Sequence, residues 1–130
     1  MTDTAEPAAA VLAFIDAFNH EDLERLGEVL DPDVVLHSAR GTRRGIADAL
    51  AWARRIEAGE LDQRVEVDSI RVDGARAIAL VRKQWWWRDG GQLAREDEVA
   101  WVFELRDGKV ARWEPFEDRA AALAAAGVRA

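Results

Sequence analysis

The sequence predicts one α+β domain: three N-terminal helices, then a strongly curved, mostly antiparallel sheet, then a short C-terminal helix. Two observations predict this class. Apolar residues recur with a helical period in the first half of the chain and alternate with a period of two after residue 60. Three Asp-Gly pairs, at 73–74, 89–90 and 107–108, separate four runs rich in Val, Ile, Trp and Phe. Asp-Gly favours tight hairpins, so these runs are expected to form a meander.

The first helix is predicted from apolar residues at positions i, i+3, i+4 and i+7, which are Val11, Phe14, Ile15 and Phe18. Asn19 and Asp22 resemble a capping box that opens a second helix, and Pro32 ends it because a residue before proline disfavours the helical conformation. A short strand over 34–38 and a basic loop over 41–45 follow. The third helix is predicted from apolar positions along one side, Ala49, Trp52, Ala53 and Ile56, with Gly59 at its end.

The four strands of the meander are predicted over 64–72, 76–88, 93–106 and 109–116. Because the middle strands are long, a bulge or bend is expected to wrap the sheet around the first and third helices. Asp118 is a suitable cap for the closing helix, and Gly127 is its expected end.

Composition excludes several classes of function. A chain of 130 residues is one domain, 1–130, with enough length for a core, and the absence of cysteine excludes a disulfide, a thiol nucleophile and a zinc–cysteine site. With two histidines, no metal site is expected. The net charge of −7 argues against nucleic acid and anionic membrane surfaces as partners. No apolar run reaches the ~20 residues of a membrane span, and a cytoplasmic protein is the default expectation.

The C-terminal third carries a family resemblance. It reads Arg-Asp-Gly-Lys-Val at 106–110, Phe-Glu-Asp-Arg at 116–119 and an alanine-rich segment at 122–127. In that order it resembles the SnoaL-like branch of the nuclear transport factor 2-like superfamily, and the likeness extends over nearly the whole chain. The resemblance implies a cone-shaped α+β barrel around a pocket and a homodimer through the outer sheet face. The superfamily includes polyketide cyclases, ketosteroid isomerases, limonene epoxide hydrolases, dehydratases and non-catalytic modules, among which fold does not choose.

The resemblance to ketosteroid isomerases places their base at Ser38 or, one residue off, at His37. Their tyrosine position falls on Phe14 and their second aspartate position on Trp101. The indole N–H of Trp101 is therefore the remaining donor for an oxyanion, and isomerisation with the usual tyrosine–aspartate pair is not expected. Epoxide hydrolases need an Asp-Arg-Asp set, of which Arg95-x-Asp97 supplies half.

Asp97 is the first catalytic candidate. Alternation along 93–106 places six residues on one face, Arg95, Asp97, Val99, Trp101, Phe103 and Leu105. Four of them are apolar, so this face is expected to be buried, and burial would disfavour the charged form of Asp97. A carboxyl group that changes its protonation state near neutral pH is a candidate general acid or base. The alternative is a structural ion pair of Asp97 with Arg95, or with Arg82 or Lys83 across the hairpin.

His37 is the second catalytic candidate because it is the only plausible base at neutral pH. If Leu36 faces inward, however, Ser38 enters the pocket and His37 faces out. Trp85, Trp86 and Trp87 are consecutive, so two face one way and one the other. The tryptophans are expected either to line a pocket for planar or polycyclic ligands, or to fill the sheet core or a dimer face.

The leading interpretation is a pocket enzyme without a cofactor that transfers protons, by isomerisation, cyclisation or dehydration, on a small, apolar, carbonyl-bearing substrate. Asp97 or His37 would move the proton, and Trp101 would donate to the developing oxyanion. The expected substrate-binding residues are Phe14, Ser38, Arg95, Val99, Trp101, Trp113 and Phe116. For Phe116 the alternative is that its side chain points outward, away from the pocket. Other hypotheses are a non-catalytic binding or dimerisation module and epoxide hydration, which would require Glu114 or Glu117 to turn towards Asp97.

Overall fold

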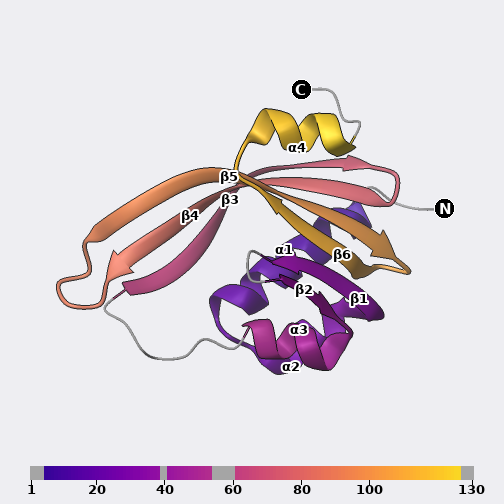
Figure 1. Ribbon diagram of the computed structural model, residues 1–130, viewed down its shortest axis with the longest axis horizontal. Helices are drawn as coiled ribbons and strands as arrows, with labels where there is room; N and C mark the ends of the chain where they lie inside the picture. The colour runs from indigo at the N-terminus through magenta and orange to yellow at the C-terminus, as the bar shows by residue number, and fades with distance from the viewer. Residues whose placement is uncertain (1–4, 39–40, 54–60, 127–130) are drawn as a thin grey trace.

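The computed structural model describes residues 5–38, 41–53 and 61–126 of the chain, which form four helices and a six-stranded sheet (Figure 1). The elements, in chain order, are α1 (Ala5–Asn19), α2 (Leu23–Val29), β1 (Leu30–Ser38), β2 (Gly41–Arg44), α3 (Ile46–Ala53), β3 (Leu61–Asp73), β4 (Arg76–Trp87), β5 (Leu93–Arg106), β6 (Lys109–Phe116) and α4 (Arg119–Ala126). The predicted α+β class is confirmed. The positions predicted to end the third and fourth helices, together with one apolar position of the third, lie outside the described residues: Ile56, Gly59 and Gly127.

The strands follow the order β2-β1-β6-β5-β4-β3. Among the strands that the structure describes, only β1 and β6 pair in parallel, so the sheet is mostly antiparallel as predicted. Within the described residues β2 and β3 are its two edges, and the sheet is a curved open cone rather than a closed barrel. The predicted loop at 41–45 was wrong in part, because Gly41–Arg44 pairs with the end of β1. This edge strand is short and largely exposed, and it lacks the apolar alternation that predicts strands.

The hairpin between β5 and β6 fixes which residues face each other across these strands. Asp107 and Gly108 have φ angles of 52° and 76°, the left-handed values that a tight two-residue turn requires. The turn brings Arg106 opposite Lys109. Further along the hairpin, Phe103 lies opposite Trp113.

The long strands are bent, as their length predicted. The register of β3 against β4 shifts between Val67 and Ser69, which marks a bulge. Figure 1 shows that β3, β4 and β5 curve strongly, so that one end of each projects away from the helices as an arm. The arm comprises the start of β3, the end of β4 and the start of β5, with Leu61 opposite Trp87.

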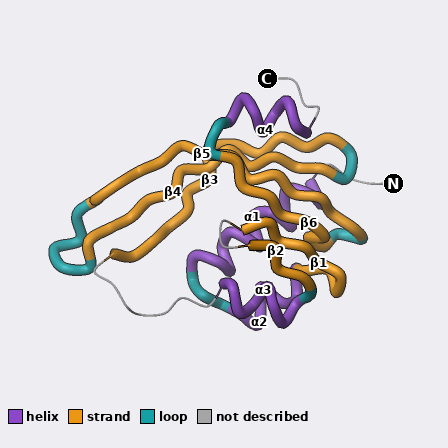
Figure 2. The backbone as a smooth tube through the Cα atoms, in the orientation of Figure 1, coloured by secondary structure: helices purple, strands orange, loops and turns teal. Residues whose placement is uncertain are grey.

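The first three helices lie on one side of the sheet and α4 lies on the other (Figure 2). Each face of the sheet carries its own apolar core. The inner core lies between the sheet and the first three helices, and it contains fully buried residues such as Phe14, Leu36 and Phe103. The outer core is small and lies beneath α4, where Ile78 and Ala100 of the sheet meet Leu123. A candidate site can therefore form on the inner face, where helices and sheet converge.

Candidate functional site

Aromatic side chains from four elements converge on the inner face of the sheet. We call this set the aromatic cluster; its members are Phe14 and Phe18 of α1, Trp52 of α3, Trp101 and Phe103 of β5, and Trp113 of β6. The ring centroids of Trp52 and Trp113 are 4.9 Å apart, and those of Trp101 and Trp113 are 5.2 Å apart at 86°. Edge-to-face and tilted contacts of this kind stabilise aromatic pairs beyond the area that they bury.

The cluster forms because the strand register places its tryptophans on one face. Trp101 lies opposite Pro115, and Phe103 opposite Trp113, so these side chains project from the same side of the β5–β6 hairpin. Phe14 and Phe18 are four residues apart on α1 and thus lie on one side of the helix. The ring contact of Trp101 and Trp113 shows that they share this face.

Trp113 is the member of the cluster with an unpartnered polar atom. Its side chain is deeply buried, at 4% relative exposure. Its Nε1–H has no hydrogen-bond acceptor among the described residues. Leaving a buried donor unpaired costs about 1–3 kcal/mol. Trp113 was predicted only as a substrate-binding residue and not as a donor, because periodicity carries no information on hydrogen-bond partners.

Asp97 lies on the inner face of β5 towards the arm, but it does not reach the cluster as a free carboxylate. Its Oδ2 is 2.9 Å from Nη2 of Arg95, and its Oδ1 accepts a hydrogen bond from Nε of Arg95 at 3.2 Å. The side chain of Asp97 is 35% exposed. The observed arrangement is therefore the ion-pair alternative with Arg95.

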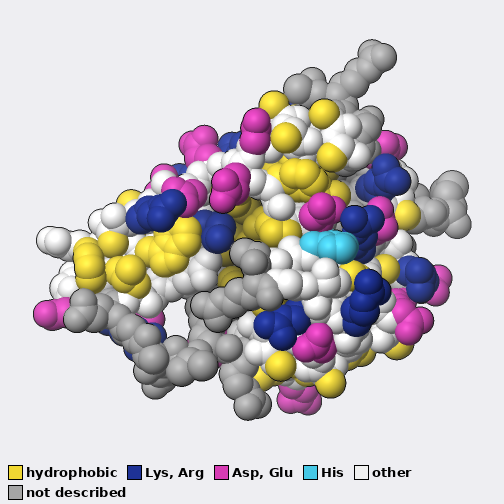
Figure 3. Space-filling model, in the orientation of Figure 1, with side chains coloured by type: hydrophobic (Ala, Val, Ile, Leu, Met, Phe, Trp, Pro, Cys, Tyr) yellow, Lys and Arg dark blue, Asp and Glu magenta, His cyan; other side chains and the backbone are white. Residues whose placement is uncertain are grey.

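Basic and aromatic side chains surround Arg95 on the arm. Trp85 lies opposite Arg95 in the hairpin, and both the Arg95 guanidinium and the Lys83 ammonium lie 5.2 Å from its ring centroid. Leu61 and Trp87, farther along the arm, are exposed large apolar residues. Figure 3 shows apolar side chains with basic ones beside them over this arm.

The burial of Leu36 near the end of β1 determines which of His37 and Ser38 faces inward. Leu36 is fully buried in the inner core and lies beside Trp113 in the parallel pairing. Alternation then places Ser38 on the inner side and His37 on the outer side. The Ser38 hydroxyl donates to the Gly41 carbonyl oxygen at 2.6 Å.

The remaining predicted binding residues divide between the two faces. Phe14, Val99, Trp101 and Trp113 all belong to the inner core. Phe116, in contrast, packs against the outer core beneath α4, so the structure separates it from the cluster. It lies opposite Ala100, one residue out of phase with Trp101, which explains the outward orientation.

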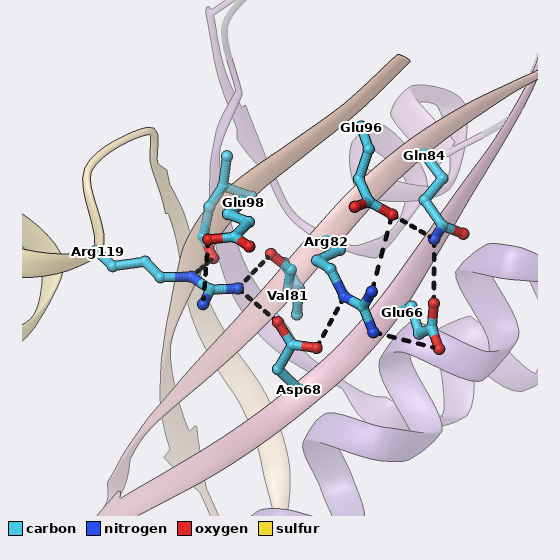
Figure 4. A network of polar contacts seen from close by, with 9 residues as sticks. Glu66, Asp68, Val81, Arg82, Gln84, Glu96, Glu98 and Arg119 are labelled. Carbon is cyan, nitrogen blue, oxygen red and sulfur yellow. Dashed lines mark hydrogen bonds and ion pairs between the residues drawn. The ribbon is translucent and has the colours of Figure 1, made fainter. Parts of the chain in front are cut away.

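A polar network that the sequence analysis did not identify covers the outer face (Figure 4). Nε of Arg82 is 2.8 Å from Oδ1 of Asp68, and Nη2 of Arg119 is 2.8 Å from Oδ2 of the same carboxylate. Gln84 donates to Glu66 at 3.1 Å and to Glu96 at 2.8 Å. Apart from Arg119 of α4, these residues lie on β3, β4 and β5, so only the register of the three strands reveals their contacts.

The network makes the stability of the fold depend on pH in the acidic range. The Arg119 hydrogen bond, followed by Arg82, lowers the pKa of Asp68 from its ordinary value of 3.8. The unfolded chain therefore takes up this proton at a higher pH than the folded chain does. The contribution of Asp68 to stability is full above pH 3.8 and is lost as the pH falls through the lower folded pKa.

Urea unfolding from pH 6 to pH 3 should show a steeper loss of stability for the natural protein than for Asp68→Asn. Equal slopes for the two proteins would contradict the assignment.

Two surface grooves lie outside the aromatic cluster. One of about 440 Å³ lies between α2 and α3 and is lined by Leu23, Glu24, Ala47, Leu50 and Ala51. The other, of about 530 Å³, lies between α1 and the edge strand β3 and is lined by Leu12, Ile15, Asp16, Asn19, Arg64, Val65, Glu66, Val67, Gln84 and Trp86. In this second groove the Asn19 side-chain amide exchanges two hydrogen bonds of 2.8 Å with the backbone of Val65. Asn19 thereby pairs part of an exposed sheet edge.

The described residues contain no group of three or more His, Cys, Asp or Glu side chains arranged to hold a metal ion. The same part of the chain holds no helix long and apolar enough to cross a membrane.

Comparison with known proteins gives the family. A family model described as a SnoaL-like domain matches residues 11–113, which is most of the chain. The chain belongs to the SnoaL-like family. Epoxide hydrolase EphG of Mycobacterium tuberculosis is 29% identical over 119 residues, covering 84% of this chain and 71% of that protein.

Solved structures agree with this SnoaL-like fold. A limonene epoxide hydrolase-like enzyme of M. tuberculosis superposes with a TM-score of 0.74 at 24% identity, covering 97% of this chain and 99% of the other. A candidate polyketide cyclase from Sinorhizobium meliloti has a TM-score of 0.63 at 26% identity, with coverages of 82% and 93%. TerC, co-crystallised with polyporic acid, has a TM-score of 0.66 at 21% identity, with coverages of 90% and 95%.

The SnoaL-like chain does not gather the residues that epoxide hydration was expected to need. Glu114 lies opposite Val102, on the outer side of the hairpin, and pairs with Arg112 at 3.0 Å. Glu117 is exposed after the end of β6. Neither carboxylate is on the inner face beside the Arg95–Asp97 pair, so the pair lacks the second carboxylate that Glu114 or Glu117 was expected to supply.

Proposed function

We propose that this SnoaL-like protein binds a small, planar, largely apolar molecule against the aromatic cluster, without a cofactor. The observation that carries the proposal is the convergence of Trp52, Trp101 and Trp113 on the inner face, with ring centroids about 5 Å apart. Aromatic rings with few polar groups among them suit flat apolar ligands, because they supply large contact areas at fixed orientation.

The position of the cluster supports access from the side where β1 and β6 end. Continuing the pairing of Leu36 with Trp113 by two residues places Ser38 beside Pro115, which in turn lies opposite Trp101. Ser38, Pro115 and Trp52 are half-buried and form the border between the buried rings and solvent. The co-crystallisation of TerC, a structural neighbour, with polyporic acid is consistent with small-ligand binding by this fold.

Nuclear magnetic resonance of the six tryptophan indole N–H groups tests the proposal directly. We expect 1-indanone, a flat bicyclic ketone, to shift the signals of Trp52, Trp101 and Trp113. The exposed Trp87 on the arm is the internal control and should not shift. Single Trp→Phe variants assign the signals. Shifts confined to Trp86 and Trp87, or no shift up to millimolar ligand, would reject the cluster as the binding site.

Proton transfer by Asp97 is a second candidate function. It is favoured by the position of Asp97 on the inner face, two residues from Val99 and four from Trp101. Arg95, which holds the carboxylate, would then position it for a substrate at the cluster.

If Asp97 acts as a base, the protein should accelerate exchange of the α-protons of 1-indanone for deuterium in D₂O. The base removes an α-proton, and solvent returns a deuteron to the same carbon. Asp97→Asn should slow this exchange about 100-fold or more while leaving the indole shifts unchanged. If the natural protein exchanges the α-protons no faster than buffer does, Asp97 does not act as a base on 1-indanone. The protein would then be a binding protein without this proton transfer.

The expected homodimer through the outer sheet face remains a proposal drawn from the family resemblance. The cytoplasmic location remains a proposal made by default. The charged network around Arg82 occupies this face, so a dimer formed there would be polar at its centre.

A further inference from the structure

We propose that the indole N–H of Trp113 is the donor that binds an oxygen acceptor, such as a carbonyl, on the ligand. This inference rests on the proposed function and deepens it, since it assigns the chemical feature that the ligand must carry. It also moves the donor role from Trp101, where the resemblance to isomerases placed it, to the neighbouring strand.

The first argument is the burial of an unpaired donor. Four buried side-chain nitrogen atoms among the described residues have no hydrogen-bond partner. Two are the Nε atoms of Arg43 and Arg112, whose guanidinium groups are already paired through other nitrogens with Asp48 and Glu114. The other two belong to tryptophans, and an indole has no second donor to compensate.

The second argument is position. Trp86 alternates with the inner-face residues and lines the groove between α1 and β3, away from the cluster. Trp113 lies within the cluster, against Trp52, Trp101 and Phe14. It is therefore the unpaired donor that an inner-face ligand would meet.

The third argument is the route to this donor. Trp52 is the half-buried member of the cluster, and its ring lies 4.9 Å from that of Trp113 at a tilt of 47°. It is carried by α3, one residue before the end of the described helix. A ligand would reach Trp113 from this side if the Trp52 side chain turned aside.

The competing explanation is internal. The ring of Trp101 is 5.2 Å away and nearly perpendicular. In such a pair one ring can direct its N–H at the face of the other, which is a weak acceptor. In that case the donor is satisfied without a ligand, and a ketone would gain nothing over a hydrocarbon of the same shape. This difference gives the test.

The test compares 1-indanone with indane, which has the same bicyclic skeleton but no oxygen. We expect both to shift the indole signals of the cluster, with 1-indanone bound about tenfold more tightly. Only the ketone should move the Trp113 N–H proton downfield and slow its exchange with solvent. The Trp113→Phe variant should bind 1-indanone and indane about equally, whereas Trp101→Phe should keep the preference for the ketone.

The outcomes separate this inference from the proposed function. Equal binding of ketone and hydrocarbon, with an unmoved Trp113 proton, would overturn the donor assignment and leave the aromatic binding site intact. Binding of neither probe would overturn both. The measurement on the natural protein decides the question even where Trp113→Phe fails to fold.

Discussion

Replacing Phe14 with alanine is expected to lower the free energy of unfolding by about 3–5 kcal/mol. Phe14 is fully buried and contacts the rings of Trp101, Phe103 and Trp113, so it joins α1 to both central strands of the inner face. Its removal leaves a cavity that the surrounding rings fill only in part. Urea denaturation followed by tryptophan fluorescence measures the change.

Leu12→Ala is the matched control for Phe14→Ala. Leu12 belongs to the same helix and is also a large apolar residue, but its side chain is 48% exposed. We expect a change within about 0.5 kcal/mol. A similar loss at both positions would show that helix formation, rather than packing of the cluster, determines the stability of this region.

Replacing Arg119 with alanine is expected to lower the free energy of unfolding by about 2 kcal/mol. Its guanidinium group donates to the carbonyl oxygens of Val81 and Val99 at 3.1 and 3.2 Å, and to Asp68 at 2.8 Å. Arg119 begins α4, so these contacts attach the last helix to the bent strands of the sheet (Figure 4). Its loss would leave three acceptors without this donor.

Two further variants sharpen the Arg119 prediction. Arg119→Lys keeps the charge but loses the planar fork, so an intermediate loss is expected. Arg106→Ala removes an arginine whose side chain is 61% exposed and whose Nη1 forms a long ion pair of 3.7 Å with Oδ1 of Asp31. We expect this variant to change the free energy of unfolding by less than about 1 kcal/mol. If alanine at 119 costs no more than alanine at 106, the network contributes little to holding α4.

The second half of the fold followed from local chemistry. The predicted bounds 93–106 and 109–116 coincide with β5 and β6, because an Asp-Gly pair defines the turn and alternation defines the strands. The first half was less accurate. The second helix was predicted to be ended by Pro32, but α2 ends at Val29 and Leu30 begins β1, where it lies beside Val110 in the parallel pairing. Such pairing depends on a strand distant in sequence, which a local period does not indicate.

The candidate site was predictable only where one hairpin determined it. Trp101 and Trp113 face together because the turn between them sets the register. The direction of Ser38 depends on β1 lying parallel to β6. The pairing of Asp97 with Arg95 depends on side-chain conformation rather than on spacing, which allowed several partners. The unpaired N–H of Trp113 requires knowledge of every neighbouring atom.

A crystal structure of the protein with 1-indanone tests the central claim, that the aromatic cluster is a binding site, most directly. We predict the bicyclic ring against Trp52, Trp101 and Trp113, with the Trp52 side chain turned from its present position. A cluster that stays closed, with the ketone bound in the groove between α1 and β3 or on the arm, would contradict it.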